Sequence, residues 1–131
     1  MLYLDSSALV KLIAPEPGSD ALDRAVAGNR IVSSDLARVE VTRAAHRTGL
    51  APSTAQMLLR DVTLVRLDPA TLSRAAALSP PGLGTLDAIH LATALAIGPA
   101  LEAFITYDRQ LGRAAAAAGL RAEAPRGGRA V

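Results

Sequence analysis

Cysteine and tryptophan are both absent from this 131-residue chain. The lack of cysteine excludes a disulfide scaffold, a thiolate zinc site and a cysteine nucleophile, and it suits a reducing compartment. Aromatic residues make up only 2% of the chain, so we do not expect an open platform that stacks many nucleic-acid bases. Any catalysis or metal binding must therefore use other side chains.

Long apolar runs are also missing. None reaches the roughly 18 residues that a membrane helix needs, and the richest one contains Asp87 and His90. The opening residues lack the basic segment and long apolar run of a signal peptide. Half of the residues are hydrophobic and a fifth are charged, which is enough for one folded core. We therefore expect a cytoplasmic protein with no membrane association.

Lysine is nearly absent, because Lys11 is the sole lysine and every other basic residue is an arginine. The 14 basic residues exceed the 12 acidic ones, which gives a formal charge of +2. Arginine suits bidentate contacts with phosphate, although a general compositional preference for Arg, Ala and Gly accounts for the pattern equally well. The charge alone leaves both explanations open.

Strand-like and helix-like segments alternate along the chain. Short apolar runs predict strands at residues 2–4, 31–32, 64–67 and 103–106, with a candidate fifth at 120–122. Capping residues, glycines and prolines predict helices at residues 6–14, 19–28, 35–48, 52–60, 68–78, 85–97 and 108–119. We expect Ser6 and Ser7 to cap the first helix, and Ser34 or Asp35 the third. One domain is expected over residues 1–124, followed by a flexible tail over residues 125–131.

This alternation predicts a three-layer α/β fold. Strands separated by helices need right-handed crossovers, which give a parallel sheet with helices on both faces. In such folds ligands bind at the carboxyl ends of the central strands. The polar residues that follow the strands are therefore the first candidates for a site.

Three aspartates follow the ends of expected strands. Asp5 and Asp108 each precede a helix, where an aspartate can simply cap the helix, and that interpretation stays open beside a functional one. Asp68 also ends a strand, but Pro69 follows it at the first helical position, which is the usual capping arrangement. We therefore assign Asp68 to structure and treat it as the control for the other two.

Two further acids lie on helices with extensive apolar surface. Glu40 lies at the edge of a core-facing stripe, where an ion pair with Arg43 is the alternative to a functional role. Asp87 lies in the first turn of a helix that is apolar nearly all round, although an acid in the first turn also suits the helix dipole. His90 and Thr93 complete its polar stripe. For His90 we favour a buried, hydrogen-bonded core histidine over a direct catalytic role.

One arrangement accounts for the four remaining acids, which we expect to converge at the carboxyl end of the sheet: Asp5, Glu40, Asp87 and Asp108. Four adjacent carboxylates would repel and raise one another's pKa unless a cation neutralised them. Oxygen ligands without cysteine or paired histidines select Mg²⁺ or Mn²⁺ over zinc. Bound divalent cations would also make the protein more positive, which suits a polyanionic substrate.

Four segments carry a family resemblance: residues 2–12, 39–44, 86–94 and 104–111. In order and spacing they resemble the motifs of PIN-domain ribonucleases, and most closely those of the VapC toxins of toxin–antitoxin pairs. The resemblance implies a parallel sheet of order 3-2-1-4-5, Mg²⁺-dependent RNA cleavage, a homodimer and neutralisation by a VapB antitoxin. Its catalytic and metal-binding acids match Asp5, Glu40, Asp87 and Asp108, and its supporting hydroxyls match Ser6 and Thr106.

The resemblance further implies a toxin that cleaves a structured RNA such as tRNA or rRNA, with Mn²⁺ able to replace Mg²⁺. An antitoxin would bring a basic residue to the acids and cover apolar helix faces around Leu9, Leu12, Leu36 and Leu58. A module that binds RNA or a partner without cutting is the alternative. A haloacid-dehalogenase phosphatase needs an acid where Ser7 stands, and a receiver domain needs a late lysine, so neither fits.

Overall fold

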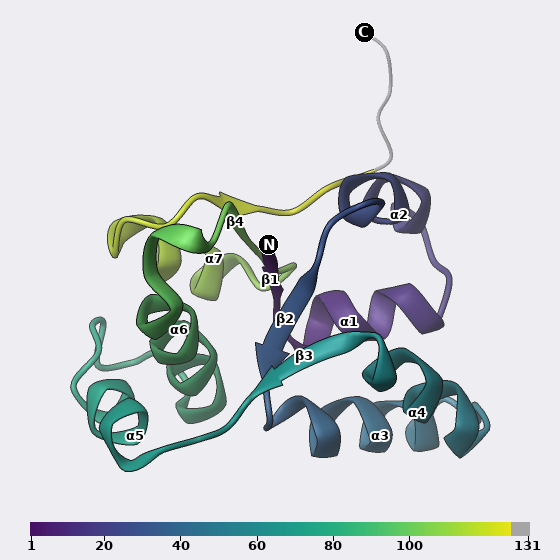
Figure 1. Cartoon of the computed structure of the whole chain (residues 1–131), viewed down its shortest axis with the longest axis horizontal. Helices are drawn as coiled ribbons and strands as arrows, with labels where there is room; N and C mark the ends of the chain where they lie inside the picture. The colour runs from purple at the N-terminus through teal and green to yellow at the C-terminus, as the bar shows by residue number, and fades with distance from the viewer. Residues whose placement is uncertain (127–131) are drawn as a thin grey trace, which may run out of the picture.

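The computed structural model describes residues 1–126, and its centre is a five-stranded parallel sheet (Figure 1). The strands follow the order β3-β2-β1-β4-β5, which confirms the expected sheet. Their bounds are β1 Leu2–Leu4, β2 Ile31–Ser34, β3 Val62–Val65, β4 Ala103–Ile105 and β5 Ala122–Glu123. The central strands β1 and β4 are buried throughout, as expected for parallel strands covered on both faces.

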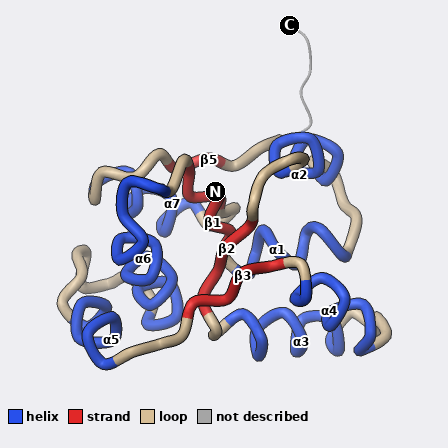
Figure 2. Tube along the Cα trace, viewed as in Figure 1, coloured by secondary structure: helices blue, strands red, loops and turns tan. Residues whose placement is uncertain are grey.

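The helices form one layer on each face of the sheet, which confirms the expected three-layer α/β architecture. One layer consists of α1 Ser6–Ile13, α2 Ser19–Val26, α3 Ala37–Arg47 and α4 Pro52–Arg60. The other consists of α5 Pro69–Ala76, α6 Thr85–Ile97 and α7 Arg109–Ala117, with a short 3₁₀ turn, Gly98–Ala100, after α6. Figure 2 shows the strands in red between these two groups of blue helices.

Each helical layer closes a separate hydrophobic core against the sheet. Leu4 and Ile105 face the α1–α4 layer, and Tyr3 and Phe104 face the α5–α7 layer. The rings of Tyr3 and Phe104 stack with centroids 5.1 Å apart and planes 4° from parallel. This stack ties β1 to β4, and it fixes the position of the Tyr3 ring.

Two expected boundaries are wrong near β3 and α3. The third strand was expected at residues 64–67 but spans Val62–Val65, because it pairs in register with all four residues of β2. Ser34 or Asp35 was expected to cap α3, but Leu36 occupies the cap position and no side chain caps the helix. Ser34 is instead the buried last residue of β2. The Ser34 hydroxyl accepts a hydrogen bond from the backbone N–H of Leu36, the residue before α3. It therefore stabilises the turn between β2 and α3 and not the first turn of the helix.

Two smaller expectations also fail. Asp5, rather than Ser6 or Ser7, caps α1, because its carboxylate accepts from the backbone N–H of Ala8. The fifth strand lies at Ala122–Glu123, two residues beyond the start of the expected 120–122, where it pairs with Phe104 and Ile105 of β4.

The expected tail begins with an ordered contact, since the Tyr107 hydroxyl donates to the Pro125 carbonyl at 2.5 Å. The rest of that expectation, residues 127–131, lies outside the described residues. Over the part of the chain that the structure describes, no helix is long and apolar enough to cross a membrane.

Candidate active site

The sheet order brings the ends of β1 and β4 together. Leu4 pairs with Ile105 in the parallel register, and the backbone N–H of Asp5 donates to the Ile105 carbonyl at 3.2 Å. Asp5 and Thr106 therefore leave the sheet side by side, although they are 101 positions apart in the chain. This point is the switch in strand order at which α/β folds bind ligands.

Asp5 is held by donors on both carboxylate oxygens. Oδ1 accepts from the Ala8 backbone at 3.0 Å and from the Ser7 hydroxyl at 2.7 Å, and Oδ2 accepts from the Thr106 hydroxyl at 2.6 Å. Only 4% of the residue is exposed. Burial raises the pKa of Asp5 in spite of these hydrogen bonds, because the charged carboxylate is less favourable away from water.

Thr106 links Asp5 to Asp108. While its hydroxyl donates to Asp5, the same oxygen accepts from the Asp108 backbone N–H at 3.1 Å. The Asp108 carboxylate caps α7 by accepting from Leu111 at 2.9 Å. Asp108 is exposed at the start of this helix, and its position relative to Asp5 is thus set through one buried threonine.

Capping alone does not separate site acids from structural ones. Asp5, Asp68 and Asp108 all accept a hydrogen bond from the backbone three residues later, so the capping interpretation holds for each. Asp68 is exposed and follows the edge strand β3, which agrees with its assignment to structure. Asp5 and Asp108 follow the adjacent central strands instead.

Glu40 projects from α3 towards the other helical layer. Its Oε1 accepts from the Ser6 hydroxyl and lies 2.7 Å from Nε2 of His90 on α6. These contacts take the place of the pair with Arg43 that the sequence left open. Burial of Glu40 opposes its ionisation, but the hydrogen bonds from His90 and Ser6 outweigh it, so the pKa of Glu40 is lowered.

His90 is a buried, hydrogen-bonded core residue, as we expected. It is 1% exposed, and its Nδ1 lies 2.7 Å from the Tyr3 hydroxyl. The sequence analysis missed Tyr3, although a tyrosine in an otherwise aliphatic central strand carries a signal, because a buried hydroxyl needs a partner. Ser7, which donates to Asp5, was assigned only to capping and was also missed.

Asp87 lies half-buried in the first turn of α6. Its pKa is raised first by burial, then by the negative charges of Asp108 and Asp5, and less strongly by Glu40. The four acids therefore lie within electrostatic reach of one another. Within residues 1–126, however, no three acidic or histidine side chains are already close enough together to form a metal site.

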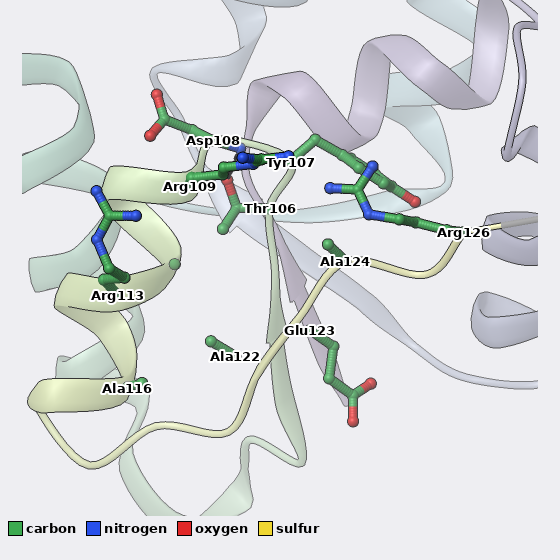
Figure 3. A pocket seen from close by; sticks show the side chains of 11 residues that line it. Thr106, Tyr107, Asp108, Arg109, Arg113, Ala116, Ala122, Glu123, Ala124 and Arg126 are labelled. Carbon is green, nitrogen blue, oxygen red and sulfur yellow. Dashed lines mark hydrogen bonds between the residues drawn. The ribbon is translucent and has the colours of Figure 1, made fainter.

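A basic pocket of about 340 Å³ adjoins Thr106 and Asp108. Its charged lining includes Arg109, Arg113 and Arg126. Figure 3 shows it between α7 and the segment that follows β5, with the Arg126 side chain beside Tyr107. The one acid at its far side, Glu123, forms an ion pair with Arg121, 2.6 Å between Nε and Oε2.

A second hollow, of about 540 Å³, lies between α1 and α3 and reaches Ser6 and Glu40. Its apolar lining includes Val39 and Leu86, which are 59% and 48% exposed. Leu9, expected on an open apolar face, is instead fully buried, because it belongs to the core between α1 and the sheet. Leu12, Leu36 and Leu58 are partly buried.

Comparisons with known proteins place this geometry in a family. The model of the PIN domain matches residues 2–117. The chain is 45% identical over 126 residues to "Ribonuclease VapC46" of Mycobacterium tuberculosis, covering 95% of this chain and 97% of that protein. It is 43% identical over 135 residues to "Ribonuclease VapC35" of the same species, with the same coverage.

Two solved structures share the fold. The crystal structure of M. tuberculosis VapC20, described as a sarcin–ricin-loop-cleaving toxin, superposes with a TM-score of 0.71 at 15% identity, over 92% of this chain and 96% of that one. A toxin–antitoxin complex from Klebsiella pneumoniae superposes with a TM-score of 0.65 at 22% identity, over 82% of this chain and 87% of that one. The chain therefore belongs to the PIN-domain family, among the VapC ribonucleases.

Proposed function

We propose that the protein is the toxin of a type II toxin–antitoxin pair and an Mg²⁺-dependent endoribonuclease that uses Asp5, Glu40, Asp87 and Asp108. The observation that carries the proposal is that Asp5 and Asp108 follow adjacent strands and both contact Thr106. The pKa of Asp87, raised first by burial and then by the charges of Asp108 and Asp5, supports it. Carboxylates that destabilise one another's charged forms provide a strong reason to bind a cation.

The chemistry of the donors fits Mg²⁺ or Mn²⁺, since all four acids offer hard oxygen ligands. Asp5, Asp87 and Asp108 would hold the ion, with Glu40 binding it or orienting the attacking water. Asp87 is half-buried and Asp108 is exposed, so neither carboxylate is enclosed by the core. When bound, such an ion supplies charge neutralisation and a more acidic water.

The surrounding side chains prepare the site for that role. Thr106 and Ser7 hold the Asp5 carboxylate in one orientation. Ser6 and His90 do the same for Glu40 from opposite helical layers. Such support of a ligand by its hydrogen-bonding neighbours is characteristic of metal sites.

The basic pocket supports a polyanionic substrate. Arg109, Arg113 and Arg126 would contact phosphates beside Asp108, because guanidinium groups bind phosphate in a bidentate manner. We propose a structured RNA, tRNA or rRNA, as the substrate and the cytoplasm as the location. The named activity of VapC20 on the sarcin–ricin loop supports an rRNA target by analogy of fold alone.

We propose a VapB-like antitoxin and a second copy of the chain as partners. The hollow between α1 and α3 supports this proposal, since Val39 and Leu86 leave exposed apolar surface next to Glu40. The toxin–antitoxin complex with the same fold agrees with it.

The proposal is tested by incubating the purified chain with total tRNA and rRNA and sequencing the new 5′ ends. We expect site-specific cleavage with Mg²⁺ or Mn²⁺ that stops with EDTA. Undiminished cleavage by fully chelated protein would refute the metal dependence. Retention of RNA without any cleavage at saturating Mg²⁺ would instead support a non-catalytic binding module.

A further inference from the structure

Both described contacts of the Glu40 carboxylate are made by one oxygen. Oε1 accepts from Ser6 and faces Nε2 of His90 at 2.7 Å. The Glu40 side chain is 20% exposed and lines the hollow beside Ser6, whereas the His90 side chain is 2% exposed. One oxygen is thus fixed in the interior, and Oε2 is the oxygen that we assign to the site.

The hydrogen bonds around His90 have a defined direction. Carboxylates are ordinarily ionised at neutral pH and then only accept hydrogen bonds, and Oε1 of Glu40 lies 2.7 Å from Nε2 of His90. Nε2 of His90 must therefore carry a proton. A neutral imidazole with its proton on Nε2 accepts at Nδ1, and we assign the donor to the Tyr3 hydroxyl, whose oxygen lies 2.7 Å from Nδ1.

The Tyr3 and His90 rings have little freedom to turn. Tyr3 is 0% exposed and stacks on Phe104. The His90 ring meets Tyr3 edge-on, at 78° and 5.8 Å between centroids. The contacts run from β1 through α6 to α3, and therefore connect the core of one helical layer to an acid of the other.

We propose that Tyr3 and His90 are positioning residues: the Tyr3 hydroxyl sets the Nε2–H tautomer of His90, which anchors Oε1 of Glu40 and leaves Oε2 directed to the metal or its water. This inference rests on the proposed function for the role of Glu40. A histidine that only fills the core would need neither this tautomer nor this orientation.

The first variant to test is Tyr3→Phe, which removes one oxygen and keeps the stack on Phe104. We expect a folded protein with about a tenfold lower kcat, an unchanged KM for RNA and a correspondingly weaker Mn²⁺ affinity. His90→Leu should lower kcat about a hundredfold. His90→Gln, whose amide N–H can donate to Glu40, should keep a kcat close to that of the wild type. His46→Gln, at the exposed histidine of α3, is the matched control and should match the wild type.

¹⁵N NMR gives a readout that is independent of activity. The chain has two histidines, and in the wild type at neutral pH we expect His90 to show a protonated Nε2 and an unprotonated Nδ1, a pattern that Tyr3→Phe disturbs. A proton on Nδ1 would overturn the inference, as would Tyr3→Phe with wild-type kcat and Mn²⁺ affinity. A third outcome separates the two proposals: the wild type shows this tautomer and Tyr3→Phe weakens Mn²⁺ binding, but no RNA is cut. In that case the positioning role of Tyr3 and His90 holds and the proposed function fails.

Discussion

Asp5 and Asp68 perform the same local task, since each caps a helix, but only Asp5 is buried with a raised pKa. We predict that Asp5→Asn lowers RNA cleavage by a factor of at least about 100. In EDTA the same variant should unfold at higher denaturant than the wild type, because a neutral amide is easier to bury than an uncompensated carboxylate. Cleavage assays and urea melts of the metal-free proteins measure both effects.

Asp68→Ala is the matched control, with the opposite pattern: full cleavage and reduced stability. The backbone hydrogen bond from Thr71 lowers the pKa of Asp68. The stabilisation from this cap is therefore complete above the ordinary carboxyl pKa and disappears as the pH falls through the lower folded-state pKa. If both variants stayed folded and lost activity equally, the separation between site acids and capping acids would be wrong.

Thr106 is a small residue with two duties, since it donates to Asp5 and accepts from the backbone of Asp108. We predict that Thr106→Val lowers the unfolding free energy by about 1–3 kcal/mol, because buried polar groups lose their partner. Cleavage should drop by roughly 10–100-fold. Thr106→Ser keeps the hydroxyl and should retain most of the activity; an equally inactive serine variant would contradict this account.

At the scale of elements, α7 contains a glycine that its conformation does not require. A Cβ at Gly112 would meet the Thr106 methyl group at 3.7 Å, an ordinary contact. We predict that Gly112→Ala raises the unfolding free energy by about 0.5–1 kcal/mol, because alanine restricts the unfolded chain more. Gly119, which follows the helix at φ +96°, should lose stability on the same change. Thermal unfolding should therefore show a higher Tm for Gly112→Ala and a lower Tm for Gly119→Ala than for the wild type.

The elements show where local sequence signals are sufficient. The ends of α5 and α6 follow from Pro69, Thr85 and Ile97, and the structure places them within two residues of expectation. The start of β3 could not be predicted, because α4 passes into it through Asp61 alone and β2 decides the register. The position of Ser34 was not predictable for a similar reason. Serine is a common helix cap, but here Ser34 pairs with Val65 of β3 and belongs to β2.

In the candidate site, too, some features could be predicted from local sequence and others could not. The acids could be selected from their places after strands or on apolar helix faces, which are properties of local sequence. The contact of Glu40 with His90 spans 50 residues, and the partnership of His90 with Tyr3 spans 87. Such contacts depend on the packing of both helical layers, so only the three-dimensional structure reveals them.

For the molecule as a whole, we predict that the proposed antitoxin and the proposed metal ion compete for the acidic site. A basic side chain entering among Asp5, Asp87 and Glu40 would replace the cation and make charge-assisted hydrogen bonds. Raising Mg²⁺ in a titration of the purified complex should weaken antitoxin binding and restore cleavage. If affinity and inhibition are insensitive both to Mg²⁺ and to removal of the partner's basic side chain, direct competition is wrong.

The contact between Asp5 and Thr106 also bears on how the protein is made. Thr106 is 101 positions after Asp5, and synthesis over that distance takes about 5–20 s at roughly 5–20 residues per second. During that time the nascent chain carries Asp5 without the strand that completes its surroundings. The proposed active site is therefore incomplete until β4 and Thr106 have been synthesised and have paired with β1.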